Sequence, residues 1–147
     1  MRASLVTAPF DPGAALSAFA ADRSRTGAVA SFVGIARGDP GSRLELDAWP
    51  EFTLGRIEAL IDDARRRFGL DDVAVIHRIG RIEAGEAIVL VMTAAAHRRA
   101  ALEACAYLMD HLKSRAPLWK KEYAADGTSR WVEPTAEDER GLDRWDA

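Results

Sequence analysis

The stretch that decides the fold class is VAVIHRIGRIEAGEAIVLVMTAAAHRRAALEACAYLMDHLK, residues 73–113. Two runs within it, 73–79 and 87–93, are rich in apolar and β-branched residues and have the length of strands. The segment 80–86 is interpreted as the connection between them, and 97–113 repeats apolar residues at helical spacing. Two strands followed directly by a helix depart from the strand–helix–strand order of parallel sheets. The stretch therefore predicts the α+β class.

The sequence predicts further strands and helices on both sides of this stretch. Strands are expected at residues 4–8, 27–35, 43–49, 118–123 and 130–132, and helices at 12–21 and 52–68. The uncharged run 27–35 is interpreted as a buried strand. The inner side of the helix 97–113 is expected to carry Ala101, Leu102, Cys105, Leu108, Met109 and Leu112. We expect one domain over residues 1–147, with a polar tail from about residue 134 that ends in a helix.

A run of three arginines at residues 65–67 closes the helix 52–68. Positive charge suits the C-terminal end of a helix dipole, and Gly69 is a typical residue for stopping the helix. We therefore interpret the run as a helix end and not as a binding patch.

Composition narrows the possible functions. The 147 residues carry a formal net charge of −3 and the pI is near 5.6, which argues against a general nucleic-acid surface. A single cysteine excludes an internal disulfide and a cysteine-based metal cage, and no spacing of histidines or carboxylates makes a metal site. No stretch is apolar enough to span a membrane, and Asp11 and Pro12 interrupt any N-terminal signal pattern. A cytoplasmic protein without metal, cofactor or membrane partner is expected.

Lysine is rare in this chain and confined to one segment. Of the 20 lysines and arginines only three are lysines, namely Lys113, Lys120 and Lys121. Arginine stays charged, whereas a lysine amine can approach neutrality and act as a base or nucleophile. If the chain doubles back at Pro117, the amines of Lys113 and Lys120 come close, and each charge lowers the pKa of the other amine. The alternative is that Lys113 caps a helix and the strand lysines protect a sheet edge.

Two further positions are candidates for binding an anion. His97 and Arg98 open a helix directly after a strand, where free backbone N–H groups favour phosphate. The alternative is that both are solvated residues of a first turn. Arg37 lies where a strand runs into a loop, a common place for a substrate-binding arginine, although a plain loop arginine has the same pattern. His77 and His111 are interpreted as structural.

These motifs together resemble the large, catalytic subunit family of molybdopterin synthase. The resemblance covers nearly the whole chain and is carried by GAVASFVGIAR (27–37), LELDAWPEF (44–52), VIHRIGRIEAGEAIVLV (75–91), AHRRAALEA (96–104), MDHLKSRAPLWKKE (109–122) and RWVE (130–133). It is most specific in 109–122. The sequence departs from the family pattern at Ala95, where a serine is frequent, and at Leu118, where an aromatic residue is common.

The resemblance implies an α/β hammerhead fold with mixed and antiparallel sheets, and a homodimer in which each chain binds a small ubiquitin-like subunit, giving a heterotetramer. The thiocarboxylated C-terminal Gly-Gly tail of that subunit would deliver two sulfurs to cyclic pyranopterin monophosphate, which makes this chain a sulfurtransferase of molybdenum cofactor biosynthesis. By motif, Lys113 and Lys120 would be catalytic. Substrate contacts would come from Ile35, Ala36, Arg37, His97, Arg98, Lys113, Lys120, Lys121 and Glu122, and pocket walls from Phe32 and Met109.

Helix geometry adds a condition to this expectation. His97 and Lys113 are sixteen residues apart on one helix, hence roughly 24 Å at the usual rise. One small substrate cannot touch both in the same subunit, so the sequence predicts a composite site at a dimer interface. The competing hypothesis is a non-catalytic adaptor that captures a ubiquitin-like tail and a phosphate ligand without turnover.

Overall fold

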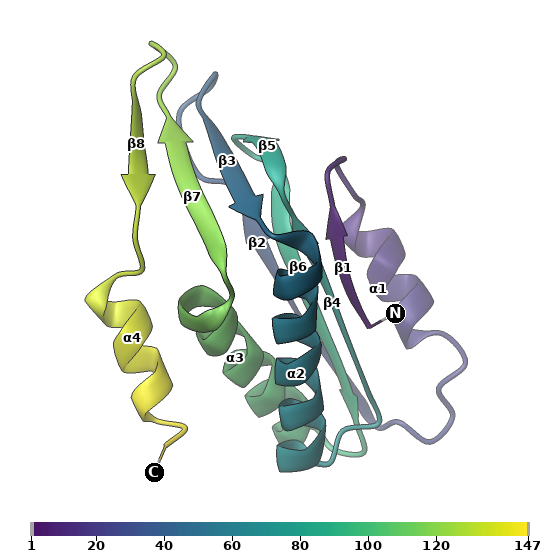
Figure 1. The fold of residues 1–147 in the computed structure, drawn as a ribbon. Coiled ribbons are helices and arrows are strands. Elements are labelled where there is room, and N and C mark those ends of the chain that lie inside the picture. Colours follow the sequence, from purple (N-terminus) through teal and green to yellow (C-terminus); the bar gives the residue numbers. More distant parts are fainter. Residues whose placement is uncertain (1, 147) are drawn as a thin grey trace.

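Two four-stranded sheets and four helices make up residues 2–146, the part of the chain that the computed structural model describes (Figure 1). The order of the first sheet is β1 (Ala3–Val6), β4 (Asp72–Arg78), β6 (Ala87–Ala95), β2 (Ala28–Ile35). The order of the second is β5 (Gly80–Glu83), β3 (Arg43–Ala48), β7 (Leu118–Tyr123), β8 (Ser129–Val132). The helices are α1 (Pro12–Ala20), α2 (Pro50–Phe68), α3 (Arg98–Arg115) and α4 (Ala136–Asp143). The expected α+β class is confirmed.

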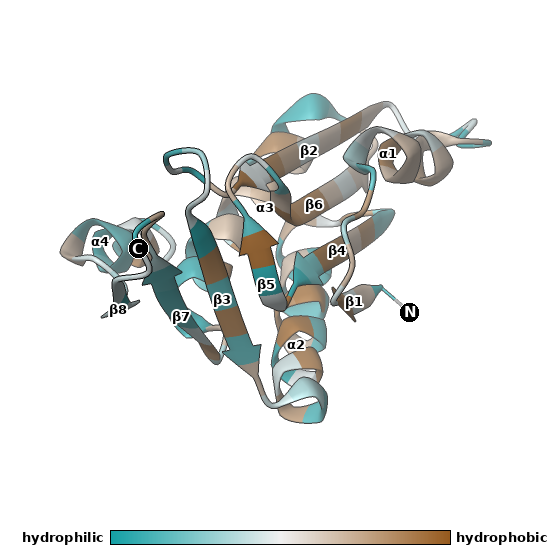
Figure 2. Cartoon of the chain, turned by 90° about the horizontal axis from the view of Figure 1, so that it is seen from above, coloured by the Kyte–Doolittle hydropathy of each residue, from teal (hydrophilic) through white to brown (hydrophobic). Residues whose placement is uncertain are grey.

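The first sheet is mixed and lies between helices. β1 runs parallel to β4, whereas β4 and β2 both pair antiparallel to β6. The helices α2 and α3 cover one face, and α1 lies on the other (Figure 2). Alternate residues of β4 and β6 enter the core shared with α2 and α3, as the period of a strand requires. The core includes Val73, Val75, Val89, Val91, Ile57, Ile61, Ala104 and Leu108.

The second sheet is antiparallel and carries the lysine-rich strand. β7 pairs with β3 on one side, with Leu46 opposite Lys120, and with β8 on the other, with Val132 opposite Lys120. A small apolar cluster of Ala36, Leu44, Leu46 and Ile82 packs where the two sheets meet. The alternation predicted for residues 43–49 is confirmed, because Leu44, Leu46 and Ala48 are all buried.

The ends of α2 follow the local sequence. Pro50 occupies the first turn, where its missing N–H costs nothing. Gly69 takes the left-handed conformation (φ 63°) after the helix, and its N–H donates to the carbonyl of Arg65. The three arginines lie in the last turn, so their interpretation as a helix end is confirmed.

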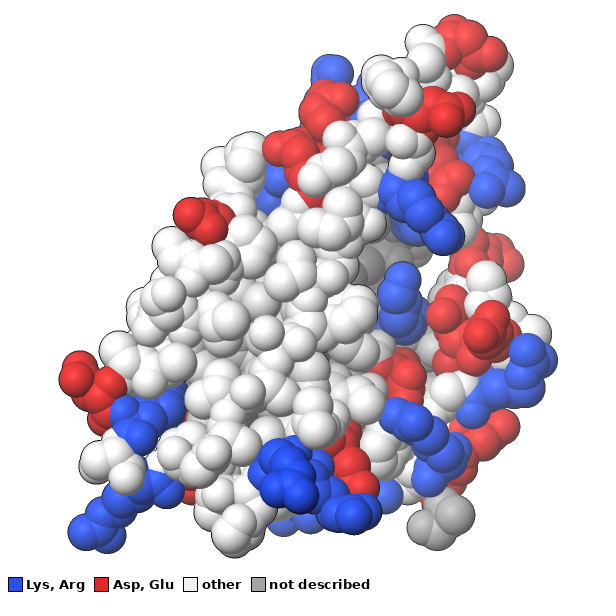
Figure 3. All heavy atoms as spheres, turned by 180° about the vertical axis from the view of Figure 1, so that it is seen from behind, with Lys and Arg blue, Asp and Glu red and all other residues white. Residues whose placement is uncertain are grey.

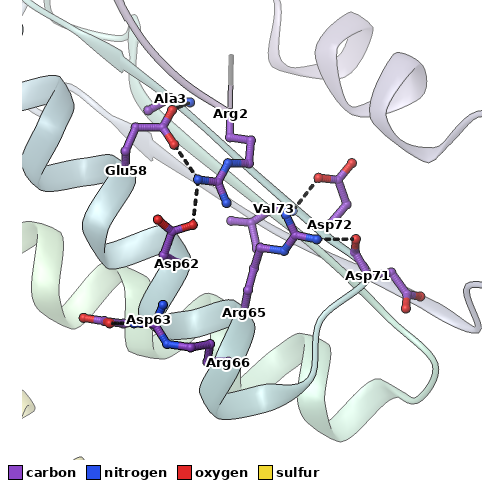
Figure 4. A network of polar contacts seen from close by, with 10 residues as sticks. All are labelled: Arg2, Ala3, Glu58, Asp62, Asp63, Arg65, Arg66, Asp71, Asp72 and Val73. Carbon is purple, nitrogen blue, oxygen red and sulfur yellow. Dashed lines mark hydrogen bonds and ion pairs between the residues drawn. The ribbon is translucent and has the colours of Figure 1, made fainter.

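Charged side chains fasten the N-terminal strand to α2 (Figure 4). The Arg2 guanidinium lies 2.8 Å from Glu58 and 2.7 Å from Asp62. The other carboxylate oxygen of Glu58 accepts the backbone N–H of Ala3 at 2.9 Å. Glu58 therefore holds both a side chain and the backbone of the segment that pairs with β4.

Three expectations were wrong in detail. The run 27–35 forms β2, but β2 is an edge strand whose C-terminal half is mostly exposed. The prediction failed because apolar composition alone does not distinguish a buried strand from an exposed edge strand. The connection 80–86 contains β5, a strand too short to stand out in the sequence. Leu102 is 60% exposed on α3 instead of buried. Within residues 2–146, no helix could cross a membrane.

Candidate functional site

The strand β7 presents its two lysines to opposite faces of the second sheet. The amine of Lys120 lies 3.7 Å from a carboxylate oxygen of Glu122, two residues along the same face. The amine of Lys121 lies 5.4 Å from the ring centre of Tyr123 and 5.2 Å from that of Trp131, as in a cation–π contact. Lys120 and Lys121 therefore have different surroundings, a polar one and an aromatic one.

Next to Lys120 and Glu122 the surface is hollowed. The open hollow has a volume of about 310 Å³ and brings together the end of β2, the start of β3 and the β7–β8 hairpin. Of the predicted site residues, Ala36, Arg37 and Glu122 line it. Segments far apart in the sequence thus meet at this hollow.

Two arginines line this hollow that the sequence alone did not single out. Arg43 lies over the Tyr123 ring at 4.1 Å, and Arg130 donates to Glu122 through Nε at 3.1 Å and Nη2 at 3.0 Å. Both sit directly across a strand pair from the residue they contact. That pairing is the signal that could have identified them, but it requires the register of the sheet. Arg37, Arg43 and Arg130 outnumber the acidic lining residues Asp39 and Glu122, which suits an anionic ligand.

Backbone hydrogen bonds fix the segment that carries Arg37. The N–H of Ala36 donates to the carbonyl of Glu86 at 2.8 Å, and the carbonyl of Ala36 accepts the N–H of Gly85 at 2.7 Å. The register between β2 and β6 shifts between Gly34 and Ile35. Such irregularities re-aim the chain near functional sites, and here Arg37 follows directly.

The candidate anion site at the start of α3 is open to solvent. His97 is the residue before the first turn, makes no capping hydrogen bond with its side chain, and is exposed together with Arg98. A Cβ on Gly27 would lie 2.0 Å from the carbonyl oxygen of Ala96, so the start of β2 packs directly against this helix end. The side chains of His97 and Arg98 are therefore accessible from solvent at this helix end.

Lys113 lies in the last turn of the same helix, at the end opposite to His97. The span of α3 keeps these residues roughly 24 Å apart. The structure therefore places His97 and Lys113 at opposite ends of α3. Among residues 2–146, no group of histidine, cysteine and carboxylate side chains could hold a metal ion.

Lys113 acts on a buried histidine of β4. The pKa of His77 is lowered, first because burial disfavours its charged form and then because the positive charge of Lys113 is near. The Nδ1–H of His77 donates to the carbonyl of Arg78 at 2.8 Å, which partly opposes the shift. His111 is likewise buried, with Nδ1 2.8 Å from the carbonyl of Tyr107.

The remaining predicted residues lie on β2 and on α3. Phe32 and Ile35 on β2 are 42% and 51% exposed, and Met109 is partly buried against the core of α3. None of these three lines the hollow. The side of the molecule where β2 and α1 lie shows a broad expanse without charged side chains (Figure 3).

Comparisons with known proteins show which family this chain and its fold resemble. The family model described as MoaE protein matches residues 5–115. The molybdopterin synthase catalytic subunit of Caulobacter vibrioides is 55% identical over 99% of this chain and 98% of its own length. The structure of the molybdopterin biosynthesis MoaE protein from Burkholderia ambifaria superposes with a TM-score of 0.84 at 39% identity, covering 99% of this chain and 97% of the other.

A more distant structure shares the fold. It belongs to the protein–protein complex of subunits 1 and 2 of the molybdopterin-converting factor from Helicobacter pylori, with a TM-score of 0.77 at 21% identity over 90% of this chain and 91% of the other. The fold and these matches define a two-sheet α+β protein of the molybdopterin-synthesising type. The chain belongs to the MoaE protein family.

Proposed function

We propose that this protein is the catalytic subunit of molybdopterin synthase. It would transfer two sulfurs from the thiocarboxylated tail of a small ubiquitin-like subunit to cyclic pyranopterin monophosphate. The observation that carries the proposal is the hollow in which Arg37 and Glu122, from distant parts of the sequence, meet beside the strand of Lys120. Full-length similarity to a catalytic subunit supports it. The cytoplasm is the proposed place of action.

The substrate would be held through its anionic group. Arg37 at the hollow, together with His97 and Arg98 at the start of a helix, would fix the phosphate and its orientation. Further contacts with the substrate would come from Ile35, Ala36, Lys121 and Glu122. The walls of the substrate pocket would include Phe32 and Met109. Positioning of this kind brings the reacting carbons to the lysines without further motion.

The two catalytic lysines would divide the chemistry. Lys113 would hold the terminal thiocarboxylate and offset negative charge as the tetrahedral adduct forms. Lys120 would move protons to and from the pterin side chain. The carboxylate of Glu122, 3.7 Å from the Lys120 amine, is placed to receive or return such a proton.

The working site would be composite. His97 and Arg98 of one protomer would reach the phosphate, while Lys113 and Lys120 of its partner act on the carbons and Arg37 of that partner helps to orient the substrate. One helix spans roughly 24 Å between His97 and Lys113, so one chain cannot supply both. A homodimer through the uncharged side that includes the exposed residues of β2 would supply this arrangement. With one small subunit per chain the assembly would be a heterotetramer.

A turnover assay tests the proposal. The purified chain is mixed with a small subunit bearing a C-terminal thiocarboxylate and with cyclic pyranopterin monophosphate, and the pterin is analysed by mass spectrometry. A gain of two sulfurs is the expected result. Binding of the small subunit without any sulfur transfer would instead support a non-catalytic adaptor.

A further inference from the structure

A charged side chain is buried where the two sheets join. Arg78, the last residue of β4, is 2% exposed and is the largest of the fully buried side chains among the described residues. Burying a guanidinium is unfavourable unless hydrogen bonds and an opposite charge compensate it. Its Nε and Nη1 have no hydrogen-bond partner in the described part of the chain. The buried guanidinium of Arg78 therefore calls for a structural or functional explanation.

The contacts of Arg78 join the two arms of one tight turn. Its Nη2 donates to the carbonyl of Arg81 on β5 at 2.7 Å, and its Nη1 lies 3.6 Å from a carboxylate oxygen of Glu86, just before β6. The other carboxylate oxygen of Glu86 accepts the backbone N–H of Glu83 at 2.7 Å. The guanidinium and the carboxylate therefore brace the turn 83–86 from within.

The braced turn holds the segment that carries Arg37. Both backbone bonds of Ala36 go to this turn, one to the carbonyl of Glu86 and one to the N–H of Gly85. Ala36 is itself only 2% exposed, whereas the next residue, Arg37, lies in the hollow. A chain of direct contacts thus runs from Arg78 through Glu86 and Ala36 to Arg37.

We propose that Arg78 and Glu86 are positioning residues that fix Arg37 relative to the lysine-bearing strand. Arg37 follows the first sheet and β7 belongs to the second, so their separation depends on the joint between the sheets. Among residues 2–146, Glu86 is the carboxylate that pairs with Arg78, and releasing it would leave a buried charge uncompensated. Glu86 is therefore held toward Arg78. The effect on catalysis rests on the proposed function, whereas the effect on the turn does not.

Hydrogen exchange tests the structural part without any assay of activity. Glu86→Gln removes the charge, and we expect the amides of Ala36 and Gly85 to exchange about tenfold faster while core amides of β6 stay unchanged. Glu83→Gln is the matched control, since Glu83 lies in the same turn but its carboxylate pairs with the exposed Arg81. If Glu86→Gln fails to fold, Glu86→Asp replaces it, with the same acceleration expected. Protection at Ala36 equal to that of the unaltered chain would overturn the proposal.

A double-mutant cycle tests the part that concerns the reaction. We expect Glu86→Gln to raise the KM for the pterin about fivefold when Arg37 is present. In a chain that already carries Arg37→Ala, Glu86→Gln should not raise the KM further, because Glu86 acts on the substrate through Arg37. Equal losses in both backgrounds would show general weakening and contradict a positioning role. Faster exchange at Ala36 in a chain that shows no turnover at all would remove the proposed reaction and leave the positioning of Arg37 standing.

Discussion

Individual side chains on β7 decide how the proposed chemistry is divided. Lys120 faces Glu122, whereas Lys121 lies against two aromatic rings, so the neighbouring amines are not equivalent. A proton can pass between an amine and a nearby carboxylate, whereas aromatic rings offer no group that accepts or returns a proton. Under the proposed function, the proton role would go to Lys120, because its amine faces a carboxylate that can accept or return a proton.

Replacement of Lys120 separates charge from proton transfer. We expect Lys120→Ala to lower kcat by about 10²–10⁴-fold, and Lys120→Arg to recover little of it, because a guanidinium keeps the charge but does not release a proton. Single-turnover sulfur transfer measures the step directly. Full activity in Lys120→Arg would refute the proton role, and Lys121→Arg serves as the comparison on the opposite face.

His77 makes stability depend on pH. Its folded-state pKa lies below the ordinary 6.5, mainly because of burial and also because of the charge of Lys113. Well above pH 6.5 His77 is unprotonated in both the folded and the unfolded chain, so its contribution to the free energy of unfolding is fully present. As the pH falls through 6.5, the unfolded chain takes up the proton first. The free energy of unfolding then decreases by at most about 1.4 kcal/mol per pH unit.

Urea unfolding between about pH 7.5 and about pH 5.5 measures this dependence. We expect His77→Gln to flatten the curve in this window. His97→Gln provides the control for replacing an exposed histidine instead of a buried one. An identical slope in His77→Gln and the unaltered chain would show that His77 takes up its proton normally when folded.

Among the secondary-structure elements, the start of β2 and the start of α3 are in contact at Gly27. We expect Gly27→Ala to destabilise the fold by about 1–3 kcal/mol. The added methyl group would clash with the carbonyl oxygen of Ala96, which belongs to the backbone and cannot move by a side-chain rotation. Gly55 on α2 has open space at the same position, so Gly55→Ala should stabilise by about 0.5–1 kcal/mol. Thermal unfolding of both variants checks the pair, and equal effects would contradict this account.

The elements differ in how far the sequence predicts them. The ends of helices α2 and α3 were predicted to within two residues, since their periodicity and end signals are local. The strand β5 was not predicted, and β2 was wrongly predicted to be buried. A short strand and an edge strand are defined by partners elsewhere in the chain, which the local sequence does not reveal. For the same reason Arg43 and Arg130 escaped notice, whereas the lysine segment was evident from composition.

At the scale of the whole molecule, the length of α3 separates the predicted binding groups. We expect His97→Ala and Lys113→Ala homodimers each to be inactive. When the two chains are co-expressed, mixed dimers contain one site built from unaltered residues, so activity should recover to about a quarter of normal. Sulfur transfer by the purified mixture measures it, and gel filtration confirms the dimer. No recovery would place His97 and Lys113 in the same site of one chain.

The pairing of distant strands has a consequence for folding during synthesis of the chain. β3 pairs with β7, and β7 is completed by β8, so the second sheet assembles only after residue 132 has been synthesised. Contacts of this range close slowly, and a nascent chain without them exposes apolar edges. The amine of Lys120 meets Glu122 on β7, whose partner β8 follows it in the chain. A half-made chain on the ribosome would therefore lack the hollow altogether and could not engage its substrate prematurely.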